Sequence, residues 1–405
     1  MQPVSFARRA AHLSPTLPPA ASPDTIAFDS GHAFPALLPD LTTEGATALT
    51  QYRSDSLQYA PRAGLPELRA WIADYMRADG ATVRSENVLV TNGAKHALEL
   101  VCRLLLDEGD GVVVTAPTYF SAIPILRSYG AVFVEVPQDR AGLDVDVLAS
   151  ILDRLARDGR PVPKFIYDVP DYHNPTGVTL SYERRVALLE LAARHQIAVV
   201  EDSPYRRVRF EGNLIPSLKA LERPDAGTVI HLGTFSKLMA PGLRVGWVAA
   251  PASLVARMAQ LKTDAGSCPL TQRIVVEFCS AGRLDAHVER VQDRYRSNRD
   301  HMVAALEREL PETSFEIPHG GYYIWLRCPA SVDGEVLATR AGEAGVAVTA
   351  GRRFFATSDA RHPRNYVRLA YSHATHDEID EGVRRLAKAF AEVADRPAVA
   401  APALR

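Results

Sequence analysis

The stretch TFSKLMAPGLRVG, residues 234–246, sets one lysine close to two hydroxyl groups and an arginine. An amine can hold an aldehyde cofactor covalently, and hydroxyl and guanidinium groups can bind a phosphate on that cofactor. Lys237 would supply the amine, and Thr234, Ser236 and Arg244 would contact the phosphate. The alternative is a surface lysine beside an ordinary Pro-Gly turn. This stretch by itself leaves both interpretations open.

Six further segments lie in the order and spacing of one enzyme family. They are residues 92–95, 116–119, 167–177, 199–205, 320–322 and 367–369. With the lysine stretch they resemble the class I/II aminotransferases, pyridoxal-phosphate enzymes of fold type I, from about residue 6 to about residue 390. Residues 6–10 and 34–35 look most like the subgroup acting on 2-aminoadipate, aromatic and branched amino acids.

The resemblance implies an activity and a cofactor. The chain would be an aminotransferase with pyridoxal 5'-phosphate, moving an amino group from an L-amino acid to a 2-oxo acid by a ping-pong mechanism. Lys237 would be its Schiff-base lysine.

Short apolar runs alternate with amphipathic stretches through the first two thirds of the chain. The runs at residues 88–90, 112–114, 132–134, 165–167, 197–200, 229–232 and 245–248 are expected to be strands. Their continuous apolarity predicts burial on both faces of a largely parallel sheet. Helices are expected at residues 94–106 and, after a Ser181 N-cap, at residues 181–194. Such alternation is typical of an α/β domain.

The last third of the chain indicates a smaller α+β lobe. A long amphipathic helix is expected near residues 286–310, then strands at residues 322–326, 346–348 and 367–369, and a final helix near residues 376–390. The resemblance implies a fold type I PLP-dependent transferase in three parts. These are an N-terminal segment (1–49) that joins the small domain, a large domain (50–285) with a mostly parallel sheet sandwiched by helices, and the small domain (286–405). Residues 13–23 and 397–405 are expected to be loosely structured.

A turn between an expected strand and helix could bind the phosphate. Gly93, Ala94 and Lys95 lie where the backbone N–H groups and the positive end of the helix would face one point. An ordinary turn that needs glycine is the alternative. The resemblance implies that the phosphate binds here, although the family commonly has serine and glutamine where Ala94 and Lys95 stand. Lys95 could still contact phosphate as a point charge.

The resemblance also implies contacts to the cofactor ring. Asp202 would pair with the pyridine nitrogen and keep it protonated, so that the ring can accept electrons; a turn or N-cap aspartate is the alternative. Asn174 and Tyr205 would hydrogen-bond the phenolate oxygen of the ring. Tyr119 would stack on the ring, although a lone tyrosine is more often part of a core.

Three residues concern the substrate and a partner subunit. Arg368 lies in an apolar run, where an unpaired guanidinium is costly, and is expected to bind the substrate carboxylate; a structural salt bridge is the alternative. Gly31 resembles the glycine whose backbone lies near the substrate, which Asn174 would also approach. Tyr59 resembles the tyrosine that reaches the phosphate of the neighbouring subunit. A homodimer with shared active sites is therefore implied.

Two other functions remain open. Ala94, Lys95, His173 and a shortened Pro-rich stretch after His12 depart from the family pattern. They motivate a PLP-dependent lyase, cyclase or oxidase of an amino acid in specialised metabolism, because one fold supports several such reactions. A non-catalytic PLP-binding effector domain of a regulator is less favoured, since the first 25 or so residues are too short for a helix-turn-helix module.

Composition argues against several partners. The 405 residues carry a formal net charge of -2 and contain no apolar run near twenty residues, so neither nucleic acid nor membrane is an expected partner. The four cysteines lack paired spacing, which predicts no metal site and buried or inert thiols in a cytoplasmic protein. The arginine-rich residues 290–299 alternate with acids and are expected to form a solvated helix face.

Overall fold

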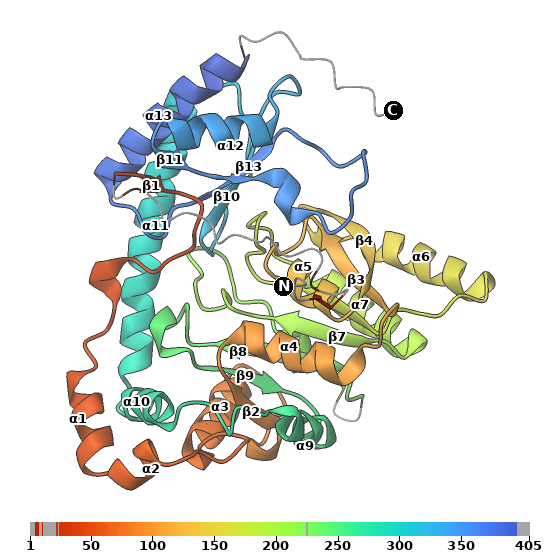
Figure 1. Cartoon of the computed structure of the whole chain (residues 1–405), viewed down its shortest axis with the longest axis vertical. Helices are drawn as coiled ribbons and strands as arrows, with labels where there is room; N and C mark the ends of the chain where they lie inside the picture. The colour runs from red at the N-terminus through yellow and green to blue at the C-terminus, as the bar shows by residue number, and fades with distance from the viewer. Residues whose placement is uncertain (1–4, 8–9, 11–21, 23, 224–225, 395–405) are drawn as a thin grey trace.

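The centre of the molecule is a twisted sheet covered by helices (Figure 1). The computed structural model describes residues 5–7, 10, 22, 24–223 and 226–394. The stretches expected to be loosely structured lie outside the described residues, except Ser22. The strands of the sheet are β2 (Val88–Thr91), β3 (Gly111–Ala116), β4 (Val132–Asp139), β5 (Gly142–Leu143), β6 (Phe165–Asp168), β7 (Ala198–Asp202), β8 (Val229–Thr234) and β9 (Gly246–Ala249).

The strand order is β2-β9-β8-β7-β6-β3-β4-β5. Every pair from β8 to β4 is parallel, whereas β9 is antiparallel to both of its neighbours and β5 is antiparallel to β4. The prediction of a largely parallel sheet is thereby confirmed.

Helices bury both faces of this sheet. Val112 and Val114 of β3 belong to one core cluster with α4, and Val113 belongs to another with α6 and α7. Ser181 caps α7 as predicted, because its Oγ accepts a hydrogen bond from the backbone N–H of Arg184 at 3.3 Å. The helices of this part are α3 (Pro66–Ala78), α4 (Ala94–Leu105), α5 (Ala122–Ser128), α6 (Val145–Arg157), α7 (Tyr182–His195), α8 (Leu218–Leu221), α9 (Ala252–Leu261) and α10 (Pro269–Ser280), with short 3-10 turns at η3 (Ser85–Asn87) and η4 (Pro241–Leu243).

One expected strand is not buried on both faces. Val132, which opens β4, is 53% exposed, and the next two residues are half-buried. Beyond β4 the sheet has only the two-residue strand β5, so this side of the sheet receives little cover. The prediction of two-sided burial was wrong for residues 132–134.

The C-terminal part carries its own small sheet, in the order β10-β13-β12. The long helix α11 runs from the large sheet to this part (Figure 1). The elements here are α11 (Arg283–Glu309), β10 (Tyr323–Arg327), α12 (Gly334–Glu343), β11 (Val346–Ala347), β12 (Thr349–Ala350), η5 (Gly351–Phe354), β13 (Tyr366–Ala370) and α13 (His376–Ala394). They include every helix and strand expected for this third of the chain, together with α12, β12 and η5, which were not expected.

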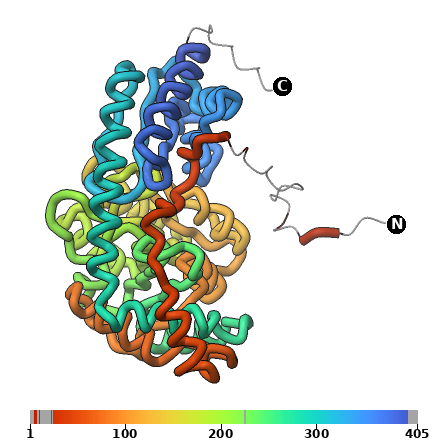
Figure 2. Tube along the Cα trace, turned by 90° about the vertical axis from the view of Figure 1, so that its left-hand side faces the viewer, coloured from red at the N-terminus to blue at the C-terminus, as the bar shows by residue number. Residues whose placement is uncertain are grey.

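The N-terminal segment spans both parts of the molecule. Strand β1 (Ile26–Ala27) pairs in parallel with β11. The chain then descends beside α11, through η2 (Pro35–Leu37), to α1 (Thr42–Thr50) and α2 (Arg53–Leu57) at the opposite end (Figure 2). The backbone N–H of Phe34 donates to the Tyr295 hydroxyl of α11 at 3.1 Å along this path. The three-part division at residues 49 and 285 stays a prediction.

One expectation about a single residue needs correction. Arg299 lies on the helix face that was expected to be solvated, yet it is only 2% exposed. Its guanidinium donates to the Pro318 carbonyl at 2.7 Å and pairs with Glu211 at 2.5 Å, which explains its burial.

Among the thiols, Cys268 is exposed and the other three are buried. Within the described ranges, no helix is both long and apolar enough to cross a bilayer.

Candidate active site

A cavity of about 430 Å³ opens where the parallel strands end. Tyr119 follows β3, Asn174 follows β6, Asp202 ends β7 and Thr234 ends β8. Because the carboxyl ends of parallel strands meet at one edge of a sheet, segments far apart in sequence converge there. The cavity is lined by these candidate residues: Ala94, Lys95, Tyr119, Asn174, Asp202, Tyr205, Thr234, Ser236, Lys237 and Arg244.

Lys237 lies in this cavity rather than on the open surface. Its Nζ donates to the Gly31 carbonyl at 2.6 Å and lies 4.7 Å from the centre of the Tyr322 ring. A Cβ at position 31 would lie 2.2 Å from the Tyr323 hydroxyl oxygen, so glycine lets the backbone lie this close to Tyr323. Burial, followed by the positive charges of nearby residues, lowers the pKa of Lys237 to about 8. A larger fraction of the amine is therefore neutral and nucleophilic near neutral pH than for an ordinary lysine.

We expect this pKa to set the pH at which the cofactor-free protein captures pyridoxal phosphate. The capture rate should rise with pH to a midpoint near 8, because only the neutral amine attacks an aldehyde. The Lys95→Gln variant removes one positive neighbour, so the pKa of Lys237 and the midpoint should both move upward. Stopped-flow absorbance over a pH series measures the rate. A wild-type midpoint at the ordinary lysine value of 10.5 would contradict the argument.

The end of the cavity that was expected to bind the phosphate concentrates positive charge. Gly93, with a φ of 88°, directly precedes α4, so free N–H groups of the helix start face the cavity. Arg244 donates to the Asn92 carbonyl at 3.0 Å. Burial and the charge of Arg244 lower the pKa of Lys95, which indicates that the two cations lie near each other. Thr234 and Ser236 hydrogen-bond each other at 3.0 Å. This end of the cavity suits a phosphate.

Asp202 has one bonded and one unbonded oxygen. Its Oδ2 accepts a hydrogen bond from the Tyr167 hydroxyl at 2.7 Å, whereas the buried Oδ1 has no partner among the described residues. Burial raises the pKa of Asp202 to about 6, and the charges of His231 and Lys95 oppose that rise. Asp202 accepts no backbone N–H bond within the described chain, so the N-cap alternative gains no support. A protonated ring nitrogen would satisfy Oδ1.

Asn174 has an unbonded donor, and Tyr205 a weakly bonded hydroxyl, that could contact a ring oxygen. Asn174 Oδ1 accepts from Arg368 Nη1 at 3.0 Å, which leaves its buried Nδ2 without a partner in the described residues. The Tyr205 hydroxyl contacts that of Tyr323 at a long 3.3 Å. Since unbonded buried donors are costly, an acceptor between Asn174 and Tyr205 would complete the site.

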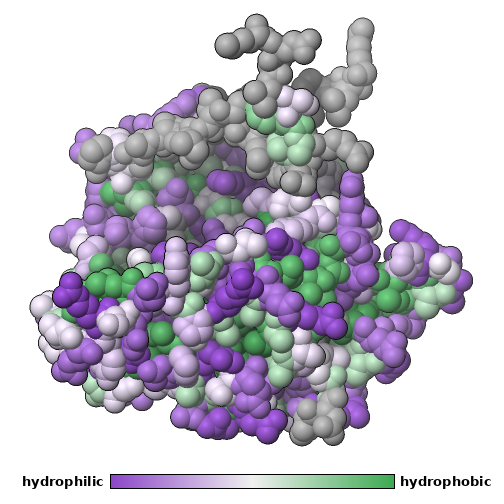
Figure 3. Space-filling model, turned by 60° about the horizontal axis from the view of Figure 1, so that its bottom comes forward, coloured by the Kyte–Doolittle hydropathy of each residue, from purple (hydrophilic) through white to green (hydrophobic). Residues whose placement is uncertain are grey.

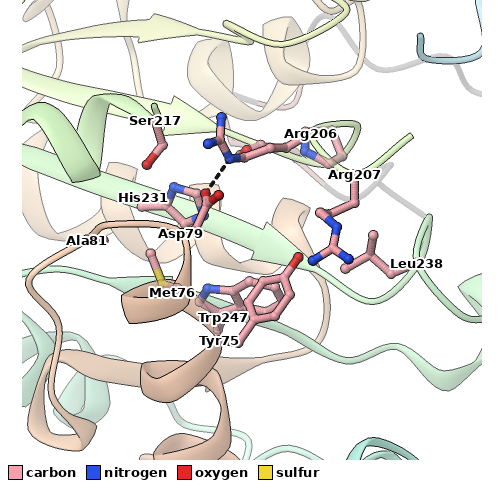
Figure 4. Close-up of a pocket in the computed structure, with 12 residues that line it drawn as sticks. Tyr75, Met76, Asp79, Ala81, Arg206, Arg207, Ser217, His231, Leu238 and Trp247 are labelled. Carbon is pink, nitrogen blue, oxygen red and sulfur yellow. Dashed lines mark hydrogen bonds and ion pairs between the residues drawn. The ribbon is translucent and has the colours of Figure 1, made fainter. Parts of the chain in front are cut away.

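A buried ion-pair network holds the segments that carry Asn174 and Tyr205. Asp171 lies between two guanidiniums, that of Arg185 at 2.6 Å and that of Arg206 at 3.4 Å. Arg206 also pairs with Asp79 at 2.5 Å, beside a small cavity of about 20 Å³ that both residues line (Figure 4). This network ties the chain around residue 172 to the chain around residue 205. It thereby fixes two walls of the site.

Arg368 is buried without an acidic partner among the described residues. It is 1% exposed, and its guanidinium bonds Asn174, Thr349 at 3.2 Å and the Asp29 carbonyl, while Nε stays unbonded. The alternative of a structural salt bridge is therefore not observed. A buried cation of this kind calls for an anionic ligand, and a substrate carboxylate provides one.

One candidate residue lies away from the cavity. Tyr59 is 81% exposed and does not line the cavity of its own chain. His173, buried behind Asn174, contacts the Thr115 hydroxyl through Nε2 at 3.0 Å, and burial lowers its pKa to about 3. Sequence reasoning gave no role to Tyr167 or to His32, which lines the cavity beside Gly31. Only the position of His32 next to Gly31 could have indicated it.

The free polar atoms of the cavity fit pyridoxal phosphate, and comparisons with known proteins agree. Residues 28–386 match the family "Aminotransferase class I and II". An aromatic-amino-acid aminotransferase of Thermococcus litoralis is 34% identical over 91% of this chain and 88% of the relative. A 2-aminoadipate transaminase of Thermus thermophilus is 36% identical over 91% of this chain and 90% of the relative.

A solved structure shares the whole architecture. It is the kynurenine aminotransferase of Pyrococcus horikoshii in complex with PMP, with a TM-score of 0.89 and 32% identity over 96% of this chain and 97% of that one. The fold type I architecture predicted from the sequence is thus confirmed, as is the pyridoxal-phosphate cofactor. This chain belongs to the class I and II aminotransferases, and it is an enzyme that transfers amino groups.

Proposed function

We propose that this aminotransferase takes its amino group from L-amino acids of the aromatic and 2-aminoadipate class and passes it to a 2-oxo acid. The named relatives that act on such substrates support the class. One observation carries the assignment of residues. A lysine amine with a lowered pKa and an aspartate with a free oxygen line one cavity, and an arginine without an acidic partner adjoins that cavity through Asn174.

The proposed mechanism gives each side chain one task. When bound, pyridoxal phosphate withdraws electrons from the substrate α-carbon. Lys237 Nζ would accept the proton that leaves the substrate α-carbon and donate it to carbon C4' of the cofactor, so that the amino group stays on the cofactor; this task suits an amine with a pKa of about 8. Asp202 Oδ1 holds the ring-nitrogen proton, and Arg368 orients the substrate carboxylate.

The balance of charge supports two anionic ligands. Lys95, Lys237 and Arg244 line the cavity with Asp202, and Arg368 adjoins it through Asn174. A phosphate and a carboxylate together would compensate this excess of positive charge. Lys95 is proposed to stand in for the usual polar contact to the phosphate as a point charge.

The visible absorption spectrum of the purified protein, followed while single amino acids are added, tests this function. Conversion of the bound cofactor to pyridoxamine phosphate by some of them, and its reversal by a 2-oxo acid, is expected. The competing lyase, cyclase or oxidase activity would consume substrate without this conversion. Free ammonia, peroxide or a cyclised product formed while the cofactor stays unchanged would therefore overturn the proposal.

A homodimer with shared sites is also proposed. Leu49, Leu57 and Tyr59 expose large apolar side chains on and after α1 and α2. Figure 3 turns this end forward and shows hydrophobic residues in a band between hydrophilic margins. Tyr59 is exposed in the single chain, as is expected of a residue that would contact the phosphate bound by a partner subunit. Sedimentation of a monomer at working concentration would refute the dimer.

A cytoplasmic location is proposed as well. Its support is that the four cysteines form no disulfide with one another. Cell fractionation would test it.

A further inference from the structure

Tyr167 is a buried tyrosine whose hydroxyl reaches the aspartate of the cofactor site. It lies in the middle of β6, and the register places it opposite Val200 of the parallel strand β7. Val200 and Asp202 are two residues apart on β7, so their side chains point to the same face of the sheet. Tyr167 lies on that face, and its hydroxyl donates to Asp202 Oδ2 at 2.7 Å.

Because of this hydrogen bond, the two oxygens of Asp202 have different surroundings. Oδ2 is occupied by Tyr167, whereas Oδ1 is buried and unbonded in the described part of the chain. A carboxylate held through one oxygen loses its freedom to rotate, and its other oxygen keeps one direction. No second hydrogen-bond donor to Asp202 is seen among the described residues.

The same bond also favours the ionised carboxylate. Burial alone raises the pKa of Asp202, and the Tyr167 bond is the largest influence that opposes this rise. The other groups that face Asp202 are His231 of β8, Lys95 of α4 and the Tyr119 hydroxyl. The pKa of Tyr167 lies well above its ordinary value, since burial and the charge of Asp202 disfavour the phenolate, so the hydroxyl keeps its proton to donate.

We propose that Tyr167 is a positioning residue of the cofactor site, whose hydroxyl holds Asp202 ionised and leaves Oδ1 free for the pyridine nitrogen. This inference rests on the proposed role of Asp202. It adds a residue that does not line the cavity itself and acts only through the aspartate.

The Tyr167→Phe variant keeps the ring and removes only the hydroxyl. We expect its dissociation constant for pyridoxal phosphate, measured by titrating the cofactor-free protein, to rise on the order of tenfold, as for the loss of a hydrogen bond to a charged group. The pKa of Asp202 should rise without this donor, so cofactor affinity should be lost at a higher pH than in wild type when the pH is lowered. A merely structural tyrosine would leave this pH profile unchanged.

A double-mutant cycle tests whether Tyr167 affects cofactor affinity through Asp202. In an Asp202→Asn background, Tyr167→Phe should change cofactor affinity much less than in wild type, because its effect passes through the carboxylate. An equal loss in both backgrounds would overturn the assignment. Tyr371→Phe is the matched control, since that buried hydroxyl donates to the Gly320 carbonyl at 3.2 Å, away from Asp202. It should leave the affinity and its pH profile unchanged.

The wild-type titration keeps the two proposals distinguishable. If the wild type bound no cofactor, the proposed function would fail. If wild type bound it and Tyr167→Phe bound it equally well at every pH, only the role of Tyr167 would fail. Thermal unfolding of each variant shows whether a loss of affinity reflects a loss of folded protein instead.

Discussion

Replacing Lys237 by alanine should lower kcat by at least about 10⁴-fold, because in the proposed mechanism this one residue provides both the covalent attachment and the proton transfer. The amine lies in the cavity, donates to the Gly31 carbonyl at 2.6 Å and has a pKa of about 8. No water molecule in the vacated space would have comparable basicity and position. Single-turnover absorbance with one amino acid measures the loss directly. Cofactor affinity should fall less than kcat, since the phosphate contacts remain.

Lys95 makes this test sharper, because a second amine lines the same cavity. Borohydride reduction of the wild-type holoenzyme, followed by peptide mapping, should label Lys237 and leave Lys95 unlabelled. The Lys237→Ala variant should take up no label at all. The Lys95→Gln variant serves as the control and should keep its label and most of its turnover. Label on Lys95, or turnover near wild type in Lys237→Ala, would remove Lys237 from its proposed role.

Most of the candidate residues named from the sequence line the cavity, because short local segments of the chain determine where they lie. Asn174, Asp202 and Thr234 each follow or end an apolar strand, and parallel strands bring such positions to one edge whatever the loops between them do. The buried strands and the capped helix α7 were predicted for the same reason, since periodicity and capping are local signals.

Features that depend on register or on distant partners were not predictable. The Tyr167–Asp202 bond exists because β6 and β7 align with Tyr167 opposite Val200, and no local pattern encodes that alignment. Arg299 is buried because Glu211 and the Pro318 carbonyl happen to face it. Val132 is exposed because its strand lies near a sparsely covered edge of the sheet. In each case tertiary neighbours decide the outcome.

Replacing Arg368 by alanine should lower kcat/KM for the amino acid about 100-fold or more, because two charge-assisted hydrogen bonds to a carboxylate are lost. The guanidinium lies 4.1 Å from the centre of the Tyr323 ring, so the carboxylate would be bound in a largely apolar setting where each bond is strong. The loss should appear mainly in KM, measured in steady state with a saturating 2-oxo acid. Arg368→Lys should recover only part of it, since lysine cannot bind both oxygens in one plane.

Arg353 provides a matched control for this second prediction. Both guanidiniums pack on the Phe120 ring, Arg368 at 5.4 Å and Arg353 at 5.2 Å from its centre, but Arg353 is exposed, whereas Arg368 is buried and bonds Asn174 of the cavity wall. Arg353→Ala should therefore leave KM for the amino acid nearly unchanged. Equal losses in the two variants would indicate that the aromatic packing matters rather than a carboxylate contact. An unchanged KM in Arg368→Ala would refute that contact outright, and the buried charge of Arg368 would then need another anionic ligand.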